Sequence, residues 1–73
     1  MKTELTFIVE EAIEGGYTAH ALDESIVTEA DTLDELREMV RDAVDCHFEP
    51  DQKPKTIHLN FVAPGRYERM FAN

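Results

Sequence analysis

Two adjacent glycines, Gly15 and Gly16, separate two segments with strand-like patterns, and this pair constrains the fold more than any other feature. Residues 3–11 alternate between apolar and polar side chains, which is the period of a half-buried strand. The apolar members that should face the core are Leu5, Phe7 and Val9. Because glycine adopts positive φ without a steric penalty, the chain can reverse into a second strand over residues 17–22. The N-terminal third is therefore predicted to be a β-hairpin.

A capping sequence predicts the start of a helix after a short third strand over residues 26–28. The Thr32 hydroxyl should accept a hydrogen bond from the backbone N–H of Glu35, and the Glu35 carboxylate should reach back to the backbone N–H of Thr32. Pro50 limits the helix, because the residue before a proline avoids helical geometry. The 3.6-residue period then places one apolar stripe toward the core. Its members are Leu36, Val40, Ala43, Val44 and His47.

A last strand is predicted where Ile57, Leu59 and Phe61 alternate with polar residues. The element order predicts an α+β fold (β-β-β-α-β), in which one helix packs on one face of a three- to four-stranded antiparallel or mixed sheet. We expect residues 1–63 to form this domain. Residues 64–73 would be a short basic and aromatic tail that docks on its own body or on a second chain. A chain of 73 residues buries little apolar surface, so self-association would stabilise it.

Charge is distributed unevenly along the chain, whose formal net charge is -9. Residues 1–49 carry fourteen acids against three bases, whereas residues 50–73 carry two acids against four bases. Nucleic acids are polyanions that proteins bind through Lys and Arg, so the acidic body is not expected to bind them, and a basic partner suits it better. The simpler alternative is that the acids only keep a small protein in solution.

No pattern of catalytic, cofactor-binding or metal-binding residues is recognisable in the sequence. The single cysteine, Cys46, excludes an internal disulfide and a cysteine-built zinc site. His20, His47 and His58 lack the short spacing of metal ligands, and the position of His47 in the apolar stripe is typical of a partly buried histidine with a backbone partner. Packing likewise explains Cys46 better than a nucleophile does. We therefore expect no enzymatic activity, cofactor or metal; a hydrolase or nuclease would require the histidines to meet acids in the fold.

Location is constrained by the absence of long apolar segments. No hydrophobic run approaches the roughly 20 residues that span a bilayer, and the first residues do not resemble a signal peptide. We expect a cytoplasmic protein that has no contact with membranes.

Two segments together resemble the HicB-like antitoxin family: Glu14-Gly15-Gly16-Tyr17-Thr18-Ala19, and the run from Ile26 through Thr28-Glu29-Ala30-Asp31-Thr32-Leu33 to Leu36. That family typically has a Gly-Gly-Tyr-like hairpin followed by a Thr-Glu-Gly-Asp-Thr-Leu-like helix start. The resemblance extends over residues 3–62. It departs at Ala30, where glycine is usual, and at Asp23-Glu24-Ser25, which replaces a Pro-Gly turn.

The resemblance implies a partial RNase H-like fold without RNase H catalysis. It also implies that the protein neutralises a small basic HicA-like ribonuclease toxin by covering its active site, and that it assembles as a homo-oligomer, with a dimer favoured. The C-terminal DNA-binding module of many family members is not expected in a chain of this length.

Our leading interpretation is a non-enzymatic, acidic protein-binding domain of the antitoxin type. The predicted partner contacts lie in the hairpin and the turn that follows it: Glu10, Glu11, Glu14, Asp23 and Glu24. The alternative is an orphan structural domain that forms a homo-oligomer through a strand edge or the aromatic tail.

Overall fold

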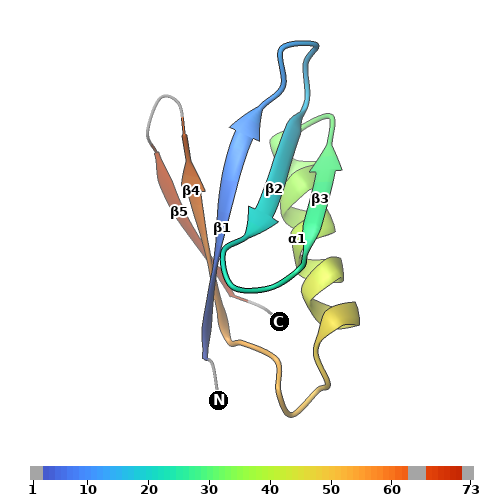
Figure 1. Ribbon diagram of the computed structural model, residues 1–73, viewed down its shortest axis with the longest axis vertical. Helices are drawn as coiled ribbons and strands as arrows, with labels where there is room; N and C mark the ends of the chain where they lie inside the picture. Colours follow the sequence, from blue (N-terminus) through green and yellow to red (C-terminus); the bar gives the residue numbers. More distant parts are fainter. Residues whose placement is uncertain (1–2, 63–65, 72–73) are drawn as a thin grey trace.

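Five strands and one helix form two layers in the computed structural model, which describes residues 3–62 and 66–71 (Figure 1). In chain order the elements are β1 (Glu4–Glu11), β2 (Tyr17–Ala21), β3 (Val27–Ala30), α1 (Leu33–His47), β4 (Thr56–Phe61) and β5 (Tyr67–Phe71). The sheet order is β3-β2-β1-β4-β5, and α1 contacts β3 and β2. All neighbouring strands are antiparallel except β1 and β4, which are parallel, so the predicted α+β fold has a mixed sheet.

The core lies between α1 and one face of the sheet, as the alternation in the sequence predicted. The inward residues of β1 and β4 are buried, as are Leu36, Val40 and Val44 on the helix. The buried strand residues are Leu5, Phe7, Val9, Ala19, Ala21, Ile57, Leu59, Phe61 and Met70. The opposite face of the sheet carries the residues that alternate with these. Among the described residues, no helix has the length and apolar character needed to cross a bilayer.

The hairpin between β1 and β2 depends on the two glycines. Gly15 has φ of 100° and Gly16 has φ of 83°, a region that other residues rarely adopt. The backbone N–H of Ala12 donates to the Gly16 carbonyl, and the N–H of Gly15 donates to the Ala12 carbonyl, each at 3.0 Å. The turn is therefore fixed by its own backbone.

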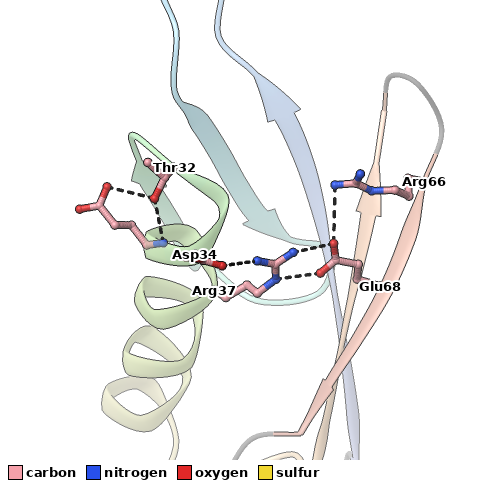
Figure 2. A network of polar contacts seen from close by, with 6 residues as sticks. Thr32, Asp34, Arg37, Arg66 and Glu68 are labelled. Carbon is pink, nitrogen blue, oxygen red and sulfur yellow. Dashed lines mark hydrogen bonds and ion pairs between the residues drawn. The ribbon is translucent and has the colours of Figure 1, made fainter.

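The helix begins as predicted, with one difference in the cap. Thr32 is the N-cap, and its hydroxyl oxygen accepts from the backbone N–H of Glu35 at 3.2 Å. The Glu35 carboxylate accepts from the Thr32 hydroxyl at 3.3 Å rather than from the backbone N–H of Thr32 (Figure 2). Asp34 and Glu35 also place negative charge in the first turn, where the helix dipole favours it.

The fifth strand raises the count above the three or four predicted strands. Residues 67–71, predicted to lie in a docking tail, pair with β4 in an antiparallel register from Thr56↔Phe71 to Asn60↔Tyr67. The inward side of β5 carries Glu68 as well as buried Met70, and this charged position interrupts the apolar alternation that marks a strand in the sequence. Arg37 of α1 satisfies that carboxylate (Figure 2).

The last turn of α1 differs from its prediction. His47 was expected to be partly buried with a backbone partner, but it is exposed and its Nε2 atom lies 3.0 Å from the Glu24 carboxylate. Cys46 is exposed too, so core packing does not explain it. Both residues lie beside β3, which is an edge strand, and within residues 3–62 and 66–71 no further strand covers this flank of the helix.

Candidate functional site

An open groove lies between the tip of the hairpin, the end of β3 and the N-terminal half of α1. It encloses about 810 Å³. In Figure 1 the hairpin tip is at the top of the molecule, above the start of the helix. The groove is lined by Ala12, Ile13, Glu14, Gly15, Gly16, Tyr17, Thr18, Glu29, Ala30, Asp31, Glu35, Glu38, Met39 and Asp42.

The groove is strongly acidic. Six of its lining residues carry a carboxylate, and all six are exposed: Glu14, Glu29, Asp31, Glu35, Glu38 and Asp42. Among the described residues the lining contains no lysine or arginine, and the ion pairs of Arg37 and Lys53 are made with acids outside it. The carboxylates therefore add their fields in one concave region, which concentrates cations and basic side chains there.

Two exposed apolar side chains accompany these acids. Ile13 at the hairpin tip is fully exposed, and Met39 on α1 is 45% exposed. Tyr17 and Ala30, partly buried against the core, complete the apolar part of the lining. A ligand that matches this groove needs both positive charge and an apolar contact.

Gly16 allows the hairpin wall to approach the end of β3. A Cβ atom at this position would lie 3.0 Å from the Ala30 carbonyl oxygen, a distance that real Cβ atoms rarely show. At Gly15 an added Cβ would meet nothing within 4 Å. The glycine pair thus has two roles: both residues make the turn, and Gly16 also closes one wall of the groove.

α1 forms the second wall of the groove, and Arg37 joins this helix to the strand β5. Arg37 donates from Nε to one Glu68 carboxylate oxygen at 2.9 Å and from Nη2 to the other at 2.8 Å. These hydrogen bonds lower the pKa of Glu68, and its partial burial opposes the shift. The same bonds raise the pKa of Arg37. Arg37 also contacts Asp34, and Arg66 lies 3.6 Å from Glu68, so four charges join α1 to β5 (Figure 2).

The five predicted contact residues are not brought together by the fold. Glu14 lines the groove, whereas Glu10 lies on the uncovered sheet face and Glu11 pairs with Tyr17 at the end of β1. Asp23 and Glu24 lie in the turn between β2 and β3, at the other end of these strands. Whether any of them contacts a partner stays a prediction.

Sequence reasoning missed five of the six groove acids. Glu35, Glu38 and Asp42 recur at helical spacing on one exposed face of α1, and this signal could have identified one wall. Glu29 and Asp31 flank Ala30 at the end of β3, and nothing local shows that they lie opposite the helix.

Two of the three histidines, His47 and His58, each contact one acid. His58 lies between the Glu4 carboxylate at Nε2 and the Tyr67 hydroxyl at Nδ1, and His47 contacts Glu24. A second, shallow hollow lies beside Cys46 and is lined by Ser25, Ile26, Val27, Ala43, Cys46 and His47. His58 lines neither this hollow nor the groove. No group of three or more potential metal ligands occurs within residues 3–62 and 66–71.

Two curated proteins are similar to this chain, and both are named UPF0150 protein. The protein from Archaeoglobus fulgidus is 59% identical over 49 residues, which cover 67% of this chain and 73% of that protein. The protein from Thermotoga maritima is 46% identical over 59 residues, which cover 81% of this chain and 83% of that protein. No protein-family model matches the chain. No solved structure matches it at a significant level.

Proposed function

The chain belongs to the UPF0150 family, and from this premise we propose that it is a non-enzymatic binding protein of the antitoxin type whose groove binds a small basic protein. The observation that carries the proposal is the groove itself, where six carboxylates and two exposed apolar side chains share one concavity without a basic residue. The resemblance to HicB-like antitoxins supports a cytoplasmic ribonuclease toxin as the partner.

Competition with RNA provides the physical mechanism. A ribonuclease binds RNA phosphates through Lys and Arg side chains, so its active-site surface is positively charged. The carboxylates of the groove can bind those Lys and Arg side chains in place of the RNA phosphates. While the groove of this protein covers the basic surface, RNA is excluded. The partial RNase H-like fold that the resemblance implies would serve only as a scaffold in this role.

Specificity would come from the apolar positions. Charge complementarity speeds encounter and is screened by salt, with a Debye length of about 10 Å at 0.1 M ionic strength. Ile13 and Met39 offer contacts that salt does not screen. We therefore expect a complex that forms quickly at low salt and weakens, but does not vanish, as salt is raised.

The proposal is tested by capturing partners from a lysate of the native host at low salt and identifying them by mass spectrometry. The test variant is Glu38→Gln/Asp42→Asn, which removes two groove charges. The matched control is Glu49→Gln/Asp51→Asn, which removes the same charges from exposed positions outside the groove.

We expect the wild type and the control to capture a small basic protein that cleaves RNA when released and not when bound. The groove variant should bind it about 2- to 30-fold more weakly, since each of the two exposed ion pairs that it removes contributes about 0.2–1 kcal/mol. Absence of a basic partner, or equal binding by the groove variant and the wild type, would refute the proposal.

A further inference from the structure

We propose that the sheet face not covered by α1 is an interface between two copies of this chain. One row of residues crosses this face from edge to edge, through the cross-strand pairs Val27–His20, His20–Ile8, Ile8–Asn60 and Asn60–Tyr67. We call the face that contains this row the open face. The groove adjoins this face at Thr18 and Glu29, but none of the residues of the row lines it, so this inference does not depend on the proposed function.

Six of the seven exposed large apolar side chains among the described residues lie in two places, and the seventh is Val62. Ile13 and Met39 lie in the groove. Leu22, Val27, Tyr67 and Phe71 lie on the open face, where their exposed fractions are 56%, 77%, 55% and 66%. These four side chains lie toward the two edges of the face, with the half-buried Ile8 between them, and exposed apolar surface of this extent is typical of an interaction surface.

Charge favours a second copy over a basic partner at this face. The chain has 16 acids, all within the described residues, and those on the open face are Glu4, Glu10 and Glu29. Glu4 lies at one end of its strand, and Glu10 and Glu29 lie at the other. The central row carries no acid. For a chain of net charge -9, two copies can therefore approach through the centre of this face with little direct repulsion.

One polar side chain near the centre, His58, can be buried without losing hydrogen bonds. Both ring nitrogens of His58 already have partners, the Glu4 carboxylate on β1 and the Tyr67 hydroxyl on β5. Burying a polar group costs free energy mainly when its hydrogen bonds are left unmade. This prearranged contact across three strands therefore suits a surface that becomes covered.

The size of the open face fits a small reversible dimer. Five strands spaced about 4.8 Å apart, with about five residues each at about 3.3 Å, span a face of roughly 20 by 17 Å. Two copies would together cover roughly 700 Å² of this flat area, the size of a weak, reversible contact. Face-to-face sheets about 10 Å apart, related by a twofold axis, would place one helix on each outer side.

Sedimentation velocity over a concentration series tests the proposal. The open-face variant Leu22→Glu/Val27→Glu introduces two acids at exposed positions, and the control Ile13→Glu/Met39→Glu introduces the same charge in the groove. We expect the wild type and the control to approach twice the 8.4 kDa of one chain at high concentration. The open-face variant should stay monomeric, with a dissociation constant raised at least tenfold. A wild type that stays monomeric, or an open-face variant that dimerises like the wild type, would overturn the inference.

A measurement without variants covers the case in which a substitution unfolds the chain. Amide chemical shifts of the wild type, followed by NMR on dilution, should change at Ile8, His20 and Asn60 and stay constant at Glu38 and Asp42. Shifts that change on α1 and not on the sheet would place the contact elsewhere and overturn the open-face interface.

Discussion

The ion pair between Arg37 and Glu68 should have a measurable effect on stability, because it is the described polar link between α1 and β5. Its two hydrogen bonds measure 2.9 and 2.8 Å, and the side chains are 32% and 24% exposed. Removing either partner leaves the other with a neighbour: Asp34 stays 2.8 Å from Arg37, and Arg66 stays 3.6 Å from Glu68. A single substitution therefore leaves no isolated buried charge.

The magnitude follows from this geometry. Exposed ion pairs contribute about 0.2–1 kcal/mol, whereas breaking a buried pair costs about 3–5 kcal/mol. Paired hydrogen bonds in the Arg–carboxylate fork favour the upper part of the exposed range. With both side chains about one-quarter to one-third exposed, we expect a coupling free energy of about 1 kcal/mol. For a domain of this size, that corresponds to about 4–8 °C in Tm.

A double-mutant cycle measures this coupling directly. Arg37→Met, Glu68→Gln and the double variant would be unfolded with urea, with circular dichroism as the signal. Each single variant should lose about 1 kcal/mol, and the double variant should lose little more than either, because the second substitution removes a contact that is already gone. Glu49→Gln, at an exposed position, should stay close to the wild type.

The pH dependence gives an independent check with a definite sign. Because the hydrogen bonds from Arg37 lower the pKa of Glu68 in the folded state, the pair is fully stabilising above the ordinary glutamate pKa of 4.5. The contribution should be lost as the pH falls through the lowered value. The difference in unfolding free energy between the wild type and Arg37→Met should thus shrink in acid. A coupling below about 0.3 kcal/mol at neutral pH, or one that does not change in acid, would refute this account.

Three further substitutions test the remaining local arguments by urea unfolding. Gly16→Ala should lower the free energy of unfolding by about 1–3 kcal/mol, because it combines positive φ with a contact to the Ala30 carbonyl. Gly15→Ala should lower it by less. Equal losses would mean that the close approach at Gly16 has no effect. Thr32→Ala should cost about 1 kcal/mol and Thr32→Ser should restore most of it, whereas no rescue would argue against the hydroxyl cap. Ile57→Val should cost about 0.5–1.5 kcal/mol, because Ile57 is fully buried, and a neutral result would indicate that the site repacks.

Elements whose signals are local were predictable from the sequence. The inward side of β1 follows from an alternation that only Ile8 interrupts, and the start of α1 follows from a cap completed within four residues. The last turn of α1 was not predictable, because the helical period states which residues share a stripe but not where the sheet beneath it ends. His47 belongs to the stripe and is nevertheless exposed beside the edge strand β3.

Features that depend on partners distant in the sequence were not predictable. The strand β5 has an inward Glu68, which makes sense only once Arg37 is known to lie above it. The groove is assembled from three separate parts of the chain, so no local pattern links its acids on the hairpin, at the end of β3 and on α1. Glu14 was identified because it adjoins the glycine pair; Glu29 has no such local marker.

The parallel pairing of β1 with β4 has a consequence for how the chain folds. Every rung of this ladder joins residues far apart in the sequence, from Glu4↔Thr56 to Val9↔Phe61. The loop between them must close before any rung forms, and contacts of this kind slow folding. During synthesis, β1, β2 and β3 emerge first, and one long edge of β1 remains unpaired until β4 has been made. An unpaired strand edge of this kind favours aggregation, so rapid release or a chaperone should increase the yield of folded protein.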